Sequence, residues 1–437
     1  MKKAIAFFMA VCMTVMISGC SSEPTFENKP TSFEEYTTDG KVTKMVGDEN
    51  LEGELNITVW SKVTDEATSE VSYAIAARRF RELYPNVDLK IEYSTEDLQT
   101  FNSQQSTEIM AGGGSDVIIT NVFGGDLYKV AMSGNFADMS GYIENDPYLN
   151  LADFNQTALA SGWIDGGQRL LPTQYLLYGT FMTTQEKAKE SGFDESQCTD
   201  TISTLKEMKE AATYNHANYN DFISALYAIG MDWVDYENET VDLSDPRLKE
   251  VYNLLQDVQN GVHETFTPMG ANEPWYFTTV SGPNGFSSFE SVQNPMLVSI
   301  PRLNGGIEAT AYEAVAINEN CSNKQAAYYF AKILLLQEWS DYERSTDSKV
   351  LPSHVVNSIG FPVYTKLLDQ WVEMGTLPES LQNDLLEHIE GIEHVGYAQC
   401  TAYSLMEESL KKYASGNISY ENLIAETENK IELALSE

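Results

Sequence analysis

The chain has 437 residues, of which 42% are hydrophobic and 11% aromatic, and it carries a formal net charge of −38 at pH 7. A chain of this length can bury a large core and favours two lobes or domains over one. The acidic surface repels nucleic acid, and the 27 basic residues form no basic block, so we exclude nucleic acid as a partner.

The first residues predict an export signal. Lys2 and Lys3 precede an apolar run over residues 4–17, which is too short for the roughly twenty residues of a membrane-spanning helix. The run ends in Ile17-Ser18-Gly19-Cys20, which resembles the lipobox of bacterial lipoproteins. This resemblance implies that residues 1–19 are a signal peptide and that the Cys20 thiol carries the lipid that anchors the protein to a membrane. An ordinary secretory signal with a chance cysteine is the alternative.

Residues 20–53 comprise the lipidated cysteine and a stretch rich in Ser, Thr, Glu, Asp, Pro and Gly without apolar periodicity. This composition predicts a disordered tether with a coil dimension of about 30 Å. No later stretch has eighteen apolar residues, so nothing else is expected to span the membrane. We therefore expect a lipid-anchored domain that faces the extracellular side or the periplasm.

The domain begins with interleaved strands and helices. Residues 55–60 alternate apolar and polar side chains, which predicts a strand, and residues 71–84 have the helical period up to Pro85. Residues 87–91 and 117–120 are further predicted strands, with a helix between them. This order of strand, helix, strand, helix and strand indicates a largely parallel sheet covered by helices.

The second half of the chain repeats this mixture. A helix is predicted to begin at Pro246, which suits the first helical position, and short strands are predicted at residues 297–300 and 314–317. Residues 324–339 and 419–435 have one apolar face each and predict helices. These elements extend the α/β pattern to the end of the chain.

Several segments, taken in order, resemble extracellular solute-binding proteins of family 1, which are bacterial sugar-binding lipoproteins of ABC importers. They are ITVW, ARRFRELYPNVDLKIEY, EIMAGGGSDVIIT, LYKVAMSGNFADMSGYIENDP, GWIDGGQRLLPTQYLLYGTFMTTQEKAKESGFD, IPRLNGGIEATAYEAVAINENCSNKQAAYYFAKILLLQEW, LPSHVV and SGNISYENLIAETENKIELAL. Together they cover nearly all of residues 54–437. The chain departs from the family at Tyr178-Gly179-Thr180-Phe181, where an expected Asn is missing, and residues 262–295 are hard to place.

The resemblance implies a two-lobed α/β fold of the periplasmic-binding-protein type II, with mostly parallel sheets flanked by helices and a ligand cleft between the lobes. It implies a monomer that captures a small solute, most often an oligosaccharide, and delivers it to ABC transporter permease subunits. The lobe boundaries follow from three strand crossings placed near residues 172–181, 296–301 and 351–352. The N-lobe then comprises residues 54–174 and 296–350, and the C-lobe comprises 175–295 and 351–437.

The ligand-binding residues are predicted from the strand ends and from the chemistry of sugars. Ligands of open α/β sheets lie beyond the carboxyl ends of strands, and sugars need aromatic faces with amides and carboxylates. The candidates are Trp60, Asn121, Phe123, Gln174, Tyr175, Trp233, Trp275 and Tyr276. Each has a structural alternative: the aromatic rings can belong to the core, and Asn121 can be a turn residue. The scarcity of arginine between the cleft segments, at Arg169, Arg247 and Arg302, favours a neutral sugar over an anion.

No catalytic, metal or cofactor motif is evident. The sequence has no Gly-x-Ser-x-Gly, and its five histidines are scattered. Cys198, Cys321 and Cys400 fit no zinc pattern, and we expect them to be free buried thiols. Chance pairs of carboxylates are certain among 65 acidic residues, so they decide nothing about hydrolysis. We therefore predict a binding protein without a cofactor, and an exported carbohydrate-active enzyme or a surface adhesin stays open as the alternative.

Overall fold

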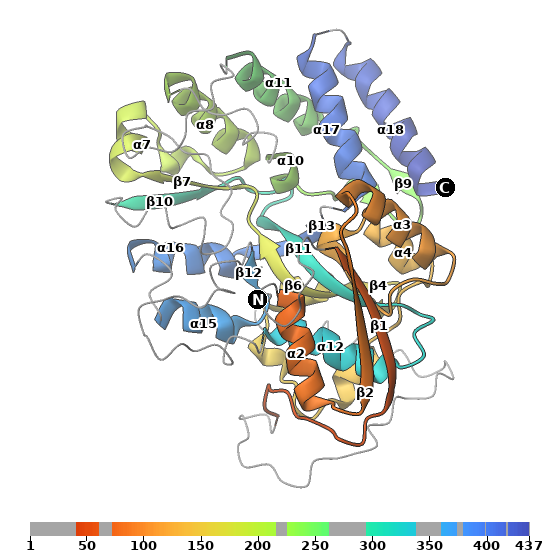
Figure 1. Ribbon diagram of the computed structural model, residues 1–437. Helices are drawn as coiled ribbons and strands as arrows, with labels where there is room; N and C mark the ends of the chain where they lie inside the picture. The colour runs from red at the N-terminus through yellow and green to blue at the C-terminus, as the bar shows by residue number, and fades with distance from the viewer. Residues whose placement is uncertain are drawn as a thin grey trace.

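The computed structural model describes residues 41–60, 72–215, 225–261, 294–337, 360–373, 379–397, 399–416 and 418–436. The signal peptide, Cys20, Trp275, Tyr276 and the predicted crossing at residues 351–352 lie outside these ranges. Helices and strands form two bodies, one in the upper and one in the lower half of Figure 1, which long strands connect. No helix among the described residues is long and apolar enough to cross a membrane.

The end of the predicted tether is packed against the protein. Met45 is 7% exposed within the first hydrophobic core, and the Thr43 hydroxyl donates a hydrogen bond to Asp153 at 2.7 Å. The Lys44 backbone N–H donates to the carbonyl of Tyr148 at 2.9 Å. The expectation of disorder up to residue 53 is therefore wrong for residues 41–52. Met45 and Leu51 are apolar anchors that pack in or against the first core, and neighbouring backbone groups pair with residues of that core.

The N-terminal elements follow the predicted order. Strand β1 (Gly53–Trp60) pairs in parallel with β2 (Val87–Ser94), and α2 (Ser72–Leu83) connects them. Helix α3 (Leu98–Met110) then leads to β3 (Val117–Ile119). The Asp116 backbone N–H donates to the carbonyl of Asn56 at 2.8 Å, and the Asp116 carboxylate accepts from the Asn56 N–H at 2.7 Å. These two bonds hold the start of β3 beside β1.

A five-stranded sheet built around β11 (Ile307–Ile317) crosses the middle of the molecule (Figure 1). The strand pairs with β6 (Leu171–Leu176) and β3 in antiparallel fashion and with β13 (Ile392–Tyr397) in parallel, and β12 (Phe361–Pro362) pairs with β6. The expectation of mostly parallel sheets is wrong, because only β1–β2 and β11–β13 are parallel among the described strand pairs. The reason is that β11 runs back toward the N-terminal strands and meets β3 and β6 in the opposite direction.

Strands β7 (Thr180–Thr184) and β10 (Pro295–Ser299) form an antiparallel ribbon between two hydrophobic cores. Side chains of a strand alternate between its two faces. Phe181 and Val298 accordingly belong to the second core, whereas Met182 and Leu297 belong to the first. The ribbon therefore contributes to both cores at once and lies at their boundary.

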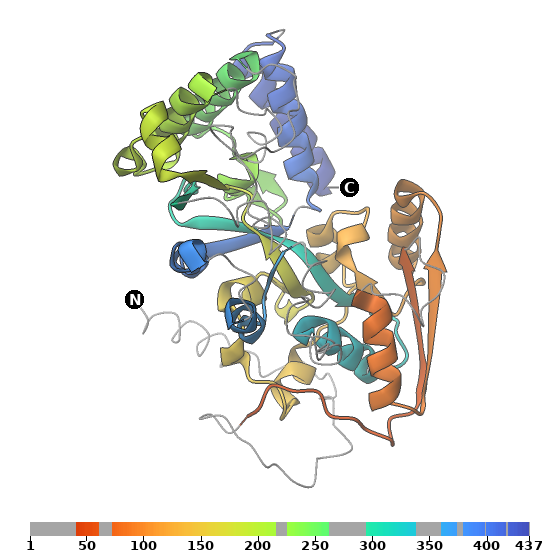
Figure 2. The same cartoon turned by 60° about the vertical axis from the view of Figure 1, so that its left-hand side comes forward.

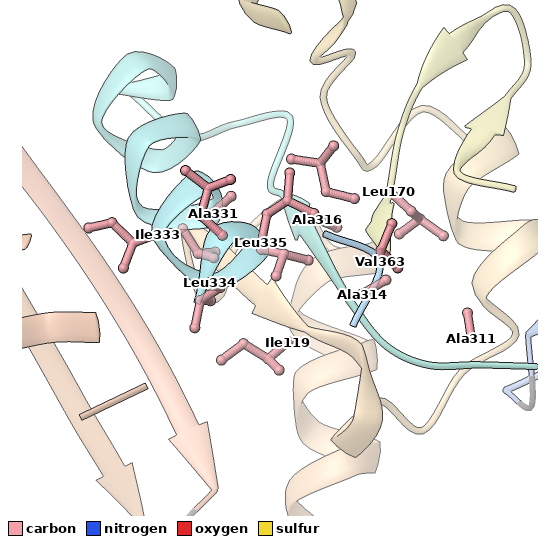
Figure 3. Packing of buried hydrophobic residues seen from close by; sticks show 14 of the residues in the cluster. Ile119, Leu170, Ala311, Ala314, Ala316, Ala331, Ile333, Leu334, Leu335 and Val363 are labelled. Carbon is pink, nitrogen blue, oxygen red and sulfur yellow. The ribbon is translucent and has the colours of Figure 1, made fainter. Parts of the chain in front are cut away.

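The first core lies between the N-terminal strands, β11 and the helix α12 (Lys324–Leu336). Figure 3 shows Leu335 of this helix beside β11 and Ile333 on the side of the helix away from it, with Leu170 and Val363 on the other side of the strand. The other helices and the hairpin strands of this half are α4 (Leu127–Met132), α5 (Ser140–Asn145), α6 (Gln156–Ala160), β4 (Trp163–Ile164), β5 (Gly167–Gln168), α15 (Thr365–Glu373) and α16 (Glu379–Glu390). Three single-turn 3-10 helices connect elements elsewhere in the chain: η1 (Thr120–Val122), η2 (Leu151–Asp153) and η3 (Glu195–Gln197).

The second core is mainly helical and occupies the upper part of Figure 2. It is formed by α7 (Gln185–Ser191), α8 (Thr201–Asn215), α10 (Ala225–Ala228), α11 (Pro246–Gly261), α17 (Thr401–Ala414) and α18 (Tyr420–Ser436), with the hairpin of β8 (Val234–Asp235) and β9 (Thr240–Val241). The predicted helices at residues 71–84, 246–259, 324–339 and 419–435 are confirmed as α2, α11, α12 and α18.

The chain changes from one core to the other at three described places. Leu177 packs in the first core and Phe181 in the second, the return lies between Leu303 and Ala309, and the last change lies between residues 397 and 400. The predicted lobe boundaries stay a prediction. The cores favour one revision, since the described core residues of α15, α16 and β13, such as Leu367, Leu385 and Val395, belong to the first core and not to the second.

Candidate functional site

Strands β6 and β11 pair irregularly just before the chain enters the second core. Two register shifts flank Glu313, which pairs with Gln174, and they leave Tyr312 on β11 and Thr173 on β6 without a ladder partner. Such bulges redirect side chains and occur more often than expected beside functional sites. We call the region around these bulges the junction and define it by Thr173, Tyr178, Tyr227, Tyr312 and Glu313 together with Asn121.

A buried carboxyl group connects both sides of the junction. Glu313 is 7% exposed, and its Oε1 accepts a hydrogen bond from the Thr173 hydroxyl at 2.8 Å. Its Oε2 accepts from the Asn121 amide nitrogen at 2.9 Å. The Ala314 backbone N–H donates to the Thr120 hydroxyl at 2.9 Å. Thr120 and Asn121 begin η1, so this network connects η1, β6 and β11. Asn121 is half-buried and is more exposed than Thr120, Thr173 and Glu313.

Burial controls the ionisation of this region. Desolvation raises the pKa of Glu313 above its ordinary value, and the hydrogen bond from Thr173 offsets part of this rise. The pKa of Tyr312 is raised by its own burial and further by the charge of Glu313. The junction therefore has a carboxyl group that holds its proton more firmly than an exposed glutamate does.

The rings of Tyr178, Tyr227 and Tyr403 form a row, in which Tyr227 is the middle ring. The ring centroids of Tyr178 and Tyr227 are 4.9 Å apart, and those of Tyr227 and Tyr403 are 4.6 Å apart. Burial raises the pKa of Tyr178, and it raises that of Tyr227 to about 12. The charge of Tyr312 adds to the pKa rise of Tyr178. Tyr178, Tyr227 and Tyr312 are half-buried, whereas Tyr403 is buried.

A glycine explains how the row is assembled. Gly179 follows Tyr178 in the connection between β6 and β7, and a Cβ atom at this position would lie 2.2 Å from the Cβ of Ala228 in α10. Only glycine lets the connection approach α10 so closely. This approach brings Tyr178 beside Tyr227, because Tyr227 precedes Ala228 in the same helix.

A second polar cluster ties the two cores together near the start of β11. Arg302 pairs with Asp232 and with Glu308, the latter at 3.0 Å, and the His394 Nδ1 lies 2.7 Å from Glu308. Glu308 is 2% exposed, and Asn304 donates a hydrogen bond to Asp232 at 2.6 Å. The guanidinium of Arg302 is thus occupied by two carboxylates of the protein.

The other two arginines between the predicted cleft segments, Arg169 and Arg247, are also engaged. Arg169 donates to the carbonyl of Phe136 at 3.1 Å. Arg247 pairs with Asp245 at 2.5 Å and donates to the carbonyl of Leu303. None of these three guanidinium groups is free to bind an anionic ligand through two parallel hydrogen bonds.

The predicted ligand-binding residues separate into buried and partly exposed groups. Phe123 and Tyr175 are 4% and 1% exposed and belong to the first core. Gln174 is 8% exposed, and its Oε1 accepts from the Gly360 N–H at 3.0 Å. Contact of these three side chains with a ligand stays a prediction, and their burial does not favour it.

Trp60, Asn121 and Trp233 are half-buried. The indole N–H of Trp60 donates to the carbonyl of Glu96 at 2.9 Å, which holds the ring against the loop after β2. The indole nitrogen of Trp233 is buried and has no hydrogen-bond partner among the described residues. Of the predicted residues that the structure describes, Asn121 bonds to Glu313 in the junction, and Gln174 pairs with Glu313 through the backbone while its side chain bonds to Gly360.

Sequence reasoning missed Tyr178, Tyr227, Tyr312 and Glu313 as site residues. One signal was present: Glu313 is a charged residue inside the apolar strand sequence ATAYEAVAI. A buried charge needs partners and often marks a functional position. The row of tyrosines has no comparable signal, because its members come from distant elements.

The described residues contain no group of three or more His, Cys, Asp or Glu that could hold a metal ion. Cys198, Cys321 and Cys400 are free thiols; the last two are buried, and Cys198 is half-buried, in contrast to the expectation. Burial raises the pKa of all three, to about 11 for Cys198 and to about 12 for Cys321 and Cys400. Such thiols are poor nucleophiles.

No protein-family model and no curated protein matches the sequence at a significant level. Solved structures do match. A family 1 extracellular solute-binding protein from Alicyclobacillus acidocaldarius is 14% identical and aligns with a TM-score of 0.57 over 89% of this chain and 100% of its own. The chain has the fold of family 1 solute-binding proteins. The predicted two-lobed α/β class is thereby confirmed.

Two sugar-binding proteins share this solute-binding fold. The sugar-binding protein MalE from Xanthomonas citri is 14% identical and aligns with a TM-score of 0.62 over 88% of this chain and 97% of its own. An oligogalacturonide-binding protein from Yersinia enterocolitica, solved with saturated digalacturonic acid, is 14% identical and has a TM-score of 0.54 over 88% and 99%. At these identities the likeness establishes the fold, and the ligand must be argued from the junction of this chain.

Proposed function

We propose that the protein captures a small carbohydrate outside the cytoplasm and delivers it to the permease subunits of an ABC transporter. The fold is that of solute-binding proteins, and sugar-binding members are among its structural neighbours. The observation that carries the proposal is the junction itself, where α10 with the half-buried Tyr227 and η1 with the hydrogen-bonded Asn121 amide both contact β11 at the boundary of two cores.

The junction has the two kinds of group that a sugar requires. A sugar ring presents flat C–H faces, which pack on aromatic rings, and hydroxyl groups, which need hydrogen-bond partners. Tyr178, Tyr227 and Tyr312 supply partly exposed faces and phenol groups, and Asn121 supplies an amide. We propose these four residues as the ligand-contacting set, with Trp60 and Trp233 as further half-exposed rings.

The charge of the protein favours a neutral ligand. The whole chain carries −38, so long-range steering opposes an anion. Arg169, Arg247 and Arg302 are engaged by protein groups and offer no free fork. One neighbour binds an acidic sugar, which means that the fold alone does not exclude such a ligand. For this chain the local charges favour a neutral oligosaccharide.

The organisation of the chain completes the proposal. Residues 1–19 are the signal peptide, Cys20 carries the lipid, and the residues up to about 40 form the tether of a monomer. We assign residues 54–177, 309–336 and 361–397 to the N-lobe and residues 181–255, 298–303 and 400–435 to the C-lobe, following the two cores. Cys20→Ala should release the protein from the membrane fraction; unchanged membrane association would contradict the anchor.

Hydrolysis is the alternative to binding, and the junction does not favour it. Glycosidases use a pair of carboxyl groups on either side of the scissile bond. The network described here contains one carboxyl group, Glu313, and both of its oxygens accept hydrogen bonds from protein side chains. Detection of reaction products with any sugar that binds would reverse this preference.

The function is tested by a thermal-shift screen of purified protein against neutral and acidic oligosaccharides. A specific ligand at a hundredfold excess over Kd should stabilise the protein by about 2.7 kcal/mol. Tyr178→Ala and Tyr227→Ala should each weaken binding of the ligand found by about 1–3 kcal/mol, by analogy with the loss of a ring that stacks on a flat ligand. Tyr413→Ala is the matched control, because Tyr413 of α17 packs against Tyr252 of α11 and Tyr420 of α18, outside the junction. Absence of any sugar ligand, or equal losses in all three variants, would refute the proposal.

A further inference from the structure

We propose that Glu313 positions the Asn121 amide so that its carbonyl oxygen faces the ligand, which makes the junction selective for solutes that donate hydrogen bonds. The identity of the solute rests on the proposed function, whereas the orientation of the amide rests on geometry alone. Glu313 is a positioning residue in this proposal and does not contact the solute.

The orientation follows from the chemistry of the two groups. An ionised carboxylate only accepts hydrogen bonds, so the Asn121 amide must present its nitrogen to Glu313. The 2.9 Å distance from Asn121 Nδ2 to Glu313 Oε2 agrees with this arrangement. The amide oxygen Oδ1 then lies on the opposite branch of the planar group, and Asn121 is half-buried, so this oxygen is directed away from the carboxylate.

The bulged strands make the arrangement rigid. Thr173 lies on β6 and has no ladder partner on β11. Its hydroxyl donates a hydrogen bond to Glu313 Oε1 at 2.8 Å and lies 3.3 Å from the Glu313 backbone carbonyl oxygen. The carboxyl group is therefore held from β6 while it holds Asn121 on η1. A side chain restrained in this way loses little entropy when a ligand binds, which increases the benefit of the contact.

The consequence is a chemical filter. An outward carbonyl oxygen accepts a hydrogen bond from the hydroxyl of a sugar or polyol. A group that only accepts, such as an ionised carboxylate, meets this oxygen with its own negative charge and finds no donor. The adjacent half-buried rings of Tyr178 and Tyr312 pack against the C–H face of the same solute.

Protonation of Glu313 reverses the arrangement. A protonated carboxyl group donates one hydrogen bond, so the Asn121 amide can turn and present its oxygen to Glu313. Burial raises the pKa of Glu313, which favours this neutral form as the pH falls. The groups that face the carboxyl are Thr173 from β6, Asn121 from η1 and the neighbouring Tyr312 on β11; among the described residues no cation affects its pKa. Affinity for a hydroxyl donor should therefore fall in acid.

The first arm of the test needs no ligand. The side-chain amide resonances of Asn121, assigned by their loss in Asn121→Ala, are followed by NMR in the purified protein together with the carboxyl carbon of Glu313 as the pH is lowered. Both should titrate with one common midpoint, and the Asn121 response should disappear in Glu313→Gln. Thr173→Val is the matched control, since it removes the other hydrogen bond to Glu313 and should keep the coupled titration. Amide resonances that do not follow Glu313, or that titrate unchanged in Glu313→Gln, would overturn the proposal.

The second arm measures binding with maltotriose, cellotriose and xylotriose as neutral probes and saturated digalacturonic acid as the acidic probe. Neutral probes should bind more tightly, with at least a fivefold loss of affinity across the titration of Glu313, and Glu313→Gln should lose this pH dependence. A neutral probe that binds with the same pH profile in both proteins would refute the positioning role and leave the function intact. If no probe binds, the carbohydrate proposal fails for these sugars, whereas the first arm still decides the role of Glu313.

Discussion

Replacing Asp126 by alanine should separate the contribution of contacts between the two cores from that of an ordinary helix cap. Asp126 precedes α4, and its Oδ1 accepts hydrogen bonds from the backbone N–H groups of Tyr128 at 3.1 Å and Lys129 at 3.2 Å. Its Oδ2 accepts from the Thr401 backbone N–H at 2.8 Å and from the Tyr236 hydroxyl at 3.2 Å. Thr401 begins α17 and Tyr236 follows β8, so one carboxylate joins the first core to the second.

The expected loss of stability has two parts. Removing the N-cap acceptor costs about 1 kcal/mol, as it does in other helices. Each hydrogen bond to a charged acceptor contributes about 1.5 kcal/mol at the lower end of its range, which suits a half-buried group. Asp126→Ala should therefore lower the free energy of unfolding by about 4 kcal/mol. Thr184→Ala is the matched control, because Thr184 caps α7 by accepting from the Lys187 N–H at 3.1 Å; it should cost about 1 kcal/mol.

Urea denaturation of the two variants and the parent protein, followed by circular dichroism and by tryptophan fluorescence, gives both losses under the same conditions. The difference between the variants is the quantity of interest, since it removes the common cost of a lost cap. We expect it to be about 3 kcal/mol. Equal losses would refute the reasoning, because they would mean that the contacts of Asp126 with Thr401 and Tyr236 contribute nothing to stability.

Three other changes test the packing of the described residues. Lys332→Met should lower the free energy of unfolding by about 3–5 kcal/mol in chemical denaturation, because it would leave the buried Asp146 carboxylate without its cation. Lys332 and Asp146 form an ion pair at 2.5 Å, and both side chains are 3% exposed. A loss below about 1 kcal/mol would contradict this. Gly179→Ala should cost about 1–3 kcal/mol in the same assay, since its Cβ would overlap that of Ala228, and an unchanged Tm would show that α10 yields freely. Glu313→Gln should become increasingly more stable than the parent as the pH rises. Burial raises the pKa of Glu313, so the parent is most stable with Glu313 protonated and loses this stability as the carboxyl group ionises. A difference in Tm that does not change with pH would argue against a buried charge.

The sequence predicts local structure well where one apolar face is strong. Helix α12 and helix α18 begin and end within three residues of the predicted limits, because their apolar residues recur with the helical period and caps mark their ends. Strand β1 is equally clear from its alternating side chains. The direction of β11 was not predictable, because strand direction depends on where the connecting segments lead and leaves no periodic signal in the strand itself.

The candidate site is less visible in the sequence than the fold. Asn121 was predicted because it follows a buried strand, where ligands of α/β proteins commonly lie. Tyr175 was predicted because it lies on the presumed crossing between the lobes, but its ring belongs to the first core and packs beside Phe361, with the ring centroids 5.9 Å apart. The face that a residue presents depends on the strand register, and of the two shifts around Glu313 only the one beside Pro172 has a residue in the sequence that could have marked it.

The irregular pairing at Glu313 is itself an argument for function. A regular ladder would leave neither Tyr312 nor Thr173 unpaired, and an apolar residue in place of Glu313 would avoid the cost of burying a carboxyl group. Stability alone therefore favours neither feature. Proteins retain such departures from local consistency mainly at sites where they are used. The departures here coincide with one another, with the half-buried tyrosines and with the boundary of the two cores, which is where we propose that the solute binds.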